Sequence, residues 1–101
     1  MSPRIRDYGI APGRLPAGPG NRITDVPGVR VGHCTLRRGA VNTGVTVVLP
    51  GLDNPFVNRY TAAAYVHNGF GKTCGLMQVQ ELGSLETPIA LTNTLNVGRV
   101  A

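Results

Sequence analysis

The sequence predicts an α/β fold in which a mixed sheet carries one short helix and follows an extended N-terminal arm. Prolines and glycines crowd residues 11–28, which excludes a helix or a central strand there. Two β-branched stretches follow within residues 29–49, and apolar side chains then recur at helical spacing within residues 72–82. We therefore divide the chain into an arm, residues 1–28, and a single α/β unit, residues 29–101.

The first two strands are expected at residues 29–36 and 43–49. The first alternates apolar with less apolar residues, and the second, TGVTVVL, is rich in β-branched residues and stops at Pro50. The two strands should form a hairpin or lie as near neighbours. His33, on the first strand, is more typical of a hydrogen-bonded structural residue than of a metal ligand.

A third strand is expected at residues 61–66, although its alanine run also suits a helix. The short helix should end at Gly83, where a C-cap glycine belongs, and a last strand follows at residues 89–92. Thr94 is placed to cap a further helix. The sequence stops one turn into that helix, which indicates a fragment. We expect the third and last strands to bring the loops that follow them to one edge of the sheet.

The composition narrows the classes of function. The net charge is +5, but the ten Lys and Arg residues are scattered with few aromatic residues between them, so nucleic-acid binding is not favoured. Cys34 and Cys74 have no metal-ligand spacing and are expected to be buried free thiols. No signal peptide and no membrane span is evident, so we expect a soluble cytoplasmic protein.

The sequence offers no convincing catalytic residue. GKT at residues 71–73 copies the end of a P-loop, but Val66 stands where the first glycine of that motif is required. Ser84 lacks the G-x-S-x-G pattern, and Cys74 with His67 is only a loose pair within one loop. The five acidic residues form no pair for acid–base work.

Five motifs in order carry a specific resemblance. RDYGI lies at residues 6–10, NRITDVPGVRVGH at 21–33, TGVT at 43–46 and NGFG at 68–71, and PIALTNT with NVG occupies 88–98. They resemble motifs of the DmpA-type aminopeptidases, the family of the β-peptidyl aminopeptidases and the L-aminopeptidase/D-esterases. The resemblance runs through nearly all 101 residues.

The resemblance implies an αββα-sandwich hydrolase, similar to N-terminal nucleophile enzymes and made as a precursor that cleaves itself. The new N-terminal serine of the smaller product is nucleophile and, through its amine, base. Such enzymes remove N-terminal residues from peptides, amides or esters, need no metal or other cofactor, and commonly form tetramers. The serine lies far beyond the position that matches Ala101, so this chain should be an N-terminal fragment that is inactive without the nucleophile-bearing C-terminal subunit.

Two loops, at residues 68–75 and 92–96, are the candidate substrate-binding elements. Glycines let backbone N–H groups approach a substrate, and threonine and asparagine can orient it, although the same glycines also suit tight turns. Lys72 stands where the resembling family usually has an acid, which reverses a charge beside the first loop. The alternative is a small non-catalytic binding or assembly module. The predicted site residues are Asn68, Gly69, Gly71, Thr92, Asn93 and Thr94.

Overall fold

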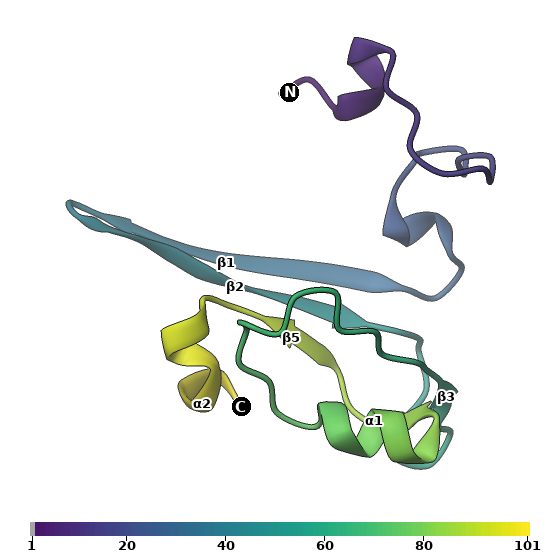
Figure 1. Cartoon of the computed structure of the whole chain (residues 1–101), viewed down its shortest axis with the longest axis vertical. Helices are drawn as coiled ribbons and strands as arrows, with labels where there is room; N and C mark the ends of the chain where they lie inside the picture. Colours follow the sequence, from purple (N-terminus) through teal and green to yellow (C-terminus); the bar gives the residue numbers. More distant parts are fainter. Residues whose placement is uncertain (1) are drawn as a thin grey trace.

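A long hairpin is the largest regular element of the structure, a computed structural model that describes residues 2–101 (Figure 1). Strand β1 spans Arg30–Arg38 and β2 spans Val41–Leu49, joined by a two-residue turn. Gly39 in that turn has a φ of 54°, and a positive φ suits the primed turns that match the twist of a hairpin. The predicted hairpin is confirmed, and both strands reach two residues closer to the turn than expected.

The strands form two small sheets. In the three-stranded sheet, of order β1-β2-β5, strand β5 at Ile89–Leu91 pairs with the end of β2. The two-stranded sheet pairs β3 at Tyr60–Thr61 with β4 at Ser84–Leu85. Every strand pair within residues 2–101 is antiparallel, so the predicted mixed sheet is wrong. The two strands of each pair therefore run in opposite directions.

The third strand is much shorter than predicted. Only Tyr60–Thr61 is a strand, and one more backbone bond follows, from the Ala62 N–H to the Gly83 carbonyl at 3.0 Å. Residues 63–66 have no ladder partner in the described part of the chain, and a strand needs one however well its side chains suit it. Because β3 and β5 belong to different sheets, the expectation that they deliver two loops to one sheet edge is also wrong.

Helix α1 spans Leu76–Leu82 and ends at Gly83, whose φ of 63° is left-handed. The C-cap prediction is confirmed, because the Gly83 N–H donates to the Val79 carbonyl. The helix begins four residues later than residue 72. Gly75 causes the delay, since its φ of 80° cannot continue a right-handed helix toward the N-terminus.

The C-terminal segment contains two short helical pieces, a 3-10 turn at Thr94–Asn96 and helix α2 at Val97–Val100. The predicted cap, Thr94, is wrong by one residue. The Asn93 side chain caps the turn instead, accepting a hydrogen bond from the Asn96 N–H at 3.2 Å. Asparagine and threonine are both good caps, so the residue types alone do not choose between neighbours.

The N-terminal arm stands clear of both sheets (Figure 1). Its regular pieces are two 3-10 turns at Ile5–Tyr8 and Ile23–Asp25, with proline- and glycine-rich chain between them. The arm therefore combines extended chain with local turns. It is folded locally and projects from the start of β1.

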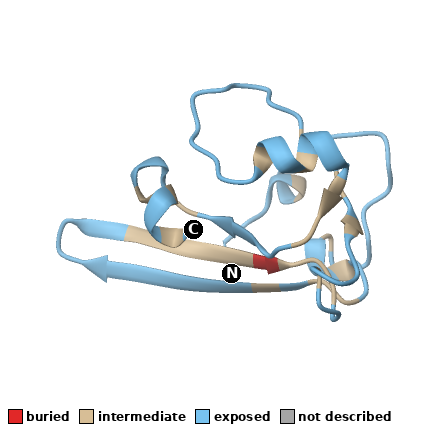
Figure 2. Ribbon diagram, turned by 90° about the horizontal axis from the view of Figure 1, so that it is seen from below, coloured by how far each residue is buried: buried red, intermediate tan, exposed pale blue. Residues whose placement is uncertain are grey.

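The structure has almost no core of its own. Among residues 2–101, only Val48 is a buried apolar side chain, at 9% exposure, and it lies on the central strand β2 (Figure 2). The accessible surface is 8605 Å², whereas a compact protein of 10.6 kDa exposes about 5,500 Å². The radius of gyration is 15.8 Å against about 13 Å for a compact domain of this length.

Candidate functional site

The first predicted loop, residues 67–75, connects the extended segment after β3 to α1. It is exposed throughout, and the Phe70 ring is 84% exposed. The Lys72 ammonium nitrogen lies 5.8 Å from the centroid of that ring, within cation–π range. The Tyr65 and His67 rings lie 6.5 Å apart at a tilt of 47°. The loop therefore presents aromatic side chains and one cation to its surroundings.

Packing inside this chain does not account for the two loop glycines. A Cβ on Gly71 would meet nothing within 4 Å, and one on Gly69 would make only an ordinary contact of 3.6 Å with Val66. Neither glycine has a positive φ. In the described residues, the backbone at these positions is open to approach from outside.

The second predicted loop is fastened to β2 by its own side chains. The Thr92 hydroxyl donates to the Gly44 carbonyl at 3.1 Å, and the Asn93 amide nitrogen donates to the Thr43 hydroxyl at 2.7 Å. The Asn93 amide oxygen accepts from both the N–H and the side-chain amide of Asn96, at 3.2 and 3.0 Å. Thr92 and Asn93 thus hold the turn in place, and Thr94 is the exposed residue of the three without a side-chain partner among residues 2–101.

Sequence reasoning missed the partners of this fastening. Thr43 and Gly44 were noted only as part of the TGVT motif, yet they receive both side-chain bonds. Gly44 also allows β1 to approach closely, because a Cβ there would lie 2.5 Å from the Cys34 carbonyl oxygen. The sequence alone could not reveal these contacts, because residues 48 to 50 positions apart meet only once the sheet has formed.

The two loops are not joined to each other. No hydrogen bond among the described residues links residues 67–75 to residues 92–96, and the strands that precede them lie in separate sheets. Hydrogen bonds among the described residues therefore fix the second loop to β2 and do not link it to the first loop.

The other chemically active side chains remain isolated. Cys34 and Cys74 are exposed free thiols, so the expectation of buried cysteines is wrong. Cys34 lies on the outer strand β1, which nothing covers, and Cys74 lies in the exposed loop. His33 is a hydrogen-bonded structural residue as predicted, with its Nδ1 2.8 Å from the hydroxyl of Thr46 on β2.

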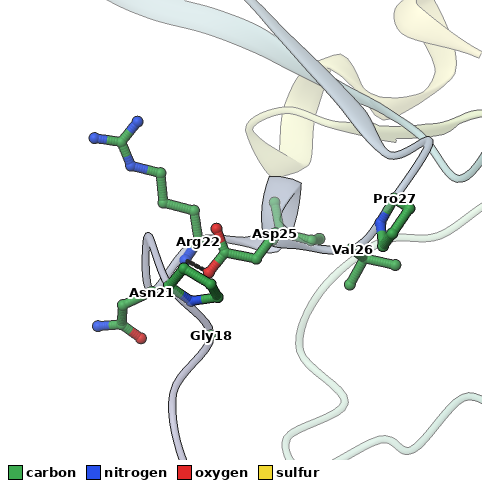
Figure 3. A pocket seen from close by; sticks show the side chains of 8 residues that line it. Gly18, Asn21, Arg22, Asp25, Val26 and Pro27 are labelled. Atoms are coloured by element: carbon green, nitrogen blue, oxygen red, sulfur yellow. Dashed lines mark hydrogen bonds between the residues drawn. The ribbon is translucent and has the colours of Figure 1, made fainter.

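A shallow hollow of about 570 Å³ lies in the N-terminal arm, outside the predicted loops (Figure 3). The Asp25 carboxylate at its centre accepts hydrogen bonds from the N–H groups of Gly20 and Arg22, at 3.0 and 3.2 Å. The Arg22 side chain points away from that carboxylate. The Arg4 guanidinium ties the same turn by donating to the carbonyls of Gly20 and Asn21. The carboxylate serves to close a turn, and no nucleophile lies among the residues that line the hollow.

Two further kinds of feature are absent from the described residues. No three side chains of His, Cys, Asp or Glu gather there as metal ligands would. No helix between residues 2 and 101 has the length and apolar character needed to cross a membrane.

Comparison with known protein families identifies relatives of this chain. The family model described as peptidase family S58 matches residues 21–101, which is most of the sequence. The chain belongs to peptidase family S58. The match contains the hairpin, both sheets, α1 and both predicted loops, and it leaves the first part of the arm outside. The DmpA-type resemblance of the sequence motifs is confirmed.

Two curated relatives of this S58 chain are beta-peptidyl aminopeptidases named BapA. The one from Sphingosinicella xenopeptidilytica is 41% identical over 97% of this chain, and the one from Sphingosinicella microcystinivorans is 37% identical over 97%. This chain covers 26% of each of them. It therefore spans about a quarter of the length of the curated relatives it matches.

Solved structures agree with this picture. The PH0078 protein from Pyrococcus horikoshii OT3 matches 92% of this S58 chain with a TM-score of 0.83 and 46% identity. A beta-aminopeptidase from Burkholderia sp. matches 96% of it with a TM-score of 0.82 and 48% identity. The matched part is 29% of each solved chain. The mixed α/β arrangement described above is thus also present within longer proteins.

Proposed function

We propose that this chain is the N-terminal portion of a self-processing serine aminopeptidase that removes N-terminal residues from peptides, amides or esters. In this proposal the complete protein is a cytoplasmic αββα-sandwich hydrolase that assembles as a tetramer. The observation that carries the proposal is the family match over residues 21–101 in a chain that covers only 26% of its beta-peptidyl aminopeptidase relatives.

The uncovered surface of the chain supports the proposal that the complete protein has a further portion that covers it, which we call the complement. The hairpin exposes Leu36 and Val41 at 47% and 51%, and Met77 on α1 is 83% exposed. The Tyr60 hydroxyl is buried without a hydrogen-bond partner among residues 2–101. Apolar surface on this scale is costly in water, so a second polypeptide that covers it would stabilise the arrangement.

In the proposed enzyme, this chain and the complement contribute different parts of the active site. The chain supplies no catalytic residue in this proposal: Ser84 sits on the short strand β4, paired with Thr61, and lacks the G-x-S-x-G pattern. The nucleophilic serine, with its own amine as base, comes from the complement. This chain contributes one wall of the substrate pocket, made of Asn68, Gly69, Gly71, Thr92, Asn93 and Thr94.

The two loops suit that wall in different ways. The open backbone at Gly69 and Gly71 allows a substrate main chain to come within hydrogen-bond reach. The second loop is held by Thr92 and Asn93, which leaves the Thr94 hydroxyl free to meet a substrate. Preorganised donors of this kind orient a substrate without the cost of ordering them during the reaction.

Complementation tests the proposal. The chain is co-expressed with the part of the Burkholderia sp. beta-aminopeptidase that lies outside its match to this chain, and we call the product the complemented pair. Hydrolysis of an aminoacyl p-nitroanilide is then measured for the chain alone, the complement alone and the complemented pair. We expect hydrolysis by the pair only.

Two results would contradict the proposal. Hydrolysis by the 101-residue chain alone would mean that it carries a nucleophile. A complement that neither co-purifies with the chain nor gains activity from it would favour the non-catalytic binding module instead. Replacing the serine that self-cleavage would expose in the complement by alanine is the matched control, because it removes the nucleophile while keeping the surface that faces this chain.

A further inference from the structure

The outer edge of β1 is the longest unpaired strand edge in the described residues. The sheet order β1-β2-β5 leaves one side of β1 without a neighbouring strand over Arg30–Arg38. Eight of its nine residues are exposed, and no backbone hydrogen bond leaves that side among residues 2–101. An edge of this length is a template for another strand.

The hairpin turn determines which backbone groups face outward. A two-residue turn is closed by a pair that exchanges both backbone hydrogen bonds, here Arg38 with Val41. Hydrogen-bonded pairs alternate along the ladder from that point. The N–H and C=O groups of every second residue therefore point away from β2, at Val31, His33, Thr35 and Arg37.

The charges along this edge select the strand that can join it. Residues 31–36 carry no formal charge, Arg30 and Arg38 lie on the same face of the sheet at the two ends of the strand, and Arg37 lies on the opposite face. A second copy of this chain, paired antiparallel about Cys34, would place Arg30 opposite Arg38 at both ends. Like charges directly opposite each other are unfavourable, and each copy already has a net charge of +5.

We infer that β1 receives an additional antiparallel strand from the complement, with acidic residues eight positions apart and an uncharged stretch between them. The inference rests on the proposed function for the source of the strand. The acids lie opposite Arg30 and Arg38, and the backbone of the added strand pairs with the four outward-facing residues. The three-stranded sheet thereby continues into the second polypeptide by strand addition.

The complemented pair tests the chemistry of the edge, because the chain alone lacks a core. The affinity of the chain for the complement is measured by fluorescence anisotropy with one labelled partner, and we expect Arg30→Glu/Arg38→Glu to weaken it at least tenfold. An unchanged affinity would overturn the inference.

A matched double variant locates the effect on β1. Arg6→Glu/Arg14→Glu changes the net charge equally but lies in the arm, and it should keep the wild-type affinity for the complement. If both double variants weaken the affinity alike, the complement responds to net charge and the inference is wrong.

Hydrogen exchange reads the pairing directly. In the complemented pair, the amides of Val31, His33, Thr35 and Arg37 should exchange as slowly as the amides of Gly32, Cys34 and Leu36, which donate to β2. Exchange at those four amides that is at least tenfold faster than at their neighbours would show an unpaired edge and would contradict strand addition.

The complemented pair separates this inference from the proposed function. If Arg30→Glu/Arg38→Glu leaves the affinity and activity of the pair unchanged, the strand is not added at β1, and the proposed function still stands. If the wild-type pair assembles with the four outward-facing amides protected but is inactive, the proposed function fails and strand addition at β1 is still supported.

Discussion

Gly44 is the residue on which the close pairing of β1 and β2 depends most directly. A Cβ at this position would lie 2.5 Å from the Cys34 carbonyl oxygen and 3.2 Å from the Thr35 Cα, and both are backbone atoms. The backbone cannot move aside as a flexible side chain can. Gly32, on the facing strand, has nothing within 4 Å of the corresponding position and provides a matched comparison.

The first prediction follows from this contrast. Gly44→Ala should lower the free energy of unfolding of the complemented pair by about 2 kcal/mol, because the two strands must separate to admit the methyl group. Gly32→Ala should be neutral or stabilise by up to about 1 kcal/mol, since it restricts the unfolded chain without a collision. Urea unfolding measures both, and equal effects at the two positions would contradict the observed packing.

Thr43 and Asn93 form the second residue-scale feature. Their 2.7 Å hydrogen bond fixes the turn that carries Thr94, so Thr43 acts on the proposed site through Asn93 without touching a substrate. Thr43→Val should lower kcat/KM of the complemented pair about fivefold, which corresponds to about 1 kcal/mol for one hydrogen bond. Thr43→Ser keeps the hydroxyl and should restore the rate.

The readout for Thr43 includes a spectroscopic control. The side-chain amide resonances of Asn93 should shift in Thr43→Val and return toward their original positions in Thr43→Ser. A loss of activity equal in both variants would mean that the hydroxyl is not the important group.

Residue-scale prediction from the sequence succeeded where a local rule applied. Gly83 was recognisable as a C-cap because helix termination is a property of adjacent residues. The exposed thiols were not recognisable, because the burial of Cys34 depends on whether anything covers β1. The cap at Asn93 was missed by one residue for a similar reason: its amide is drawn toward Thr43, fifty positions away.

At the scale of elements, α1 is the clearest case of a locally encoded structure. It lies between two glycines with left-handed φ, Gly75 at 80° and Gly83 at 63°. Gly83→Ala should destabilise the complemented pair by about 1 kcal/mol, because a Cβ is unfavourable in the left-handed region. Gly83→Asn should cost less, since asparagine tolerates that conformation. Thermal unfolding measures both, and an equal effect of the two substitutions would argue against a backbone origin.

Whether a strand could be predicted depends on how far away in the sequence its partner strand lies. The hairpin of β1 and β2 was predictable, because turn and alternation are adjacent in the chain. The third strand was predicted over six residues and formed over two, because its ladder depends on β4, which follows a loop and a helix. The antiparallel direction of the β2–β5 and β3–β4 pairs was not evident from residue patterns either.

The candidate site, too, could be predicted only in those features that depend on neighbouring residues. The sequence identified two loops of suitable composition, and both occur as exposed connections beside regular elements. It did not predict that Thr92 and Asn93 are occupied in holding β2 while Thr94 is free. That distinction requires the fold, because the acceptors lie on a strand far away in the sequence.

At the scale of the whole molecule, the exposed surface is the dominant feature. The chain exposes 8605 Å² where about 5,500 Å² is expected, and a single apolar side chain is buried among residues 2–101. Folding must offset a conformational entropy cost of about 1–2 kcal/mol per residue for the backbone alone. Burial on this small scale does not supply that free energy, which agrees with the proposal that a missing portion of the protein packs against this chain.

Differential scanning calorimetry of the 101-residue chain alone tests this central claim most directly. We predict no cooperative heat-absorption peak for the isolated chain, because it lacks a core whose loss would be all-or-none. A single sharp transition, with equal calorimetric and van't Hoff enthalpies, would show that the chain is an independent domain and would contradict the account.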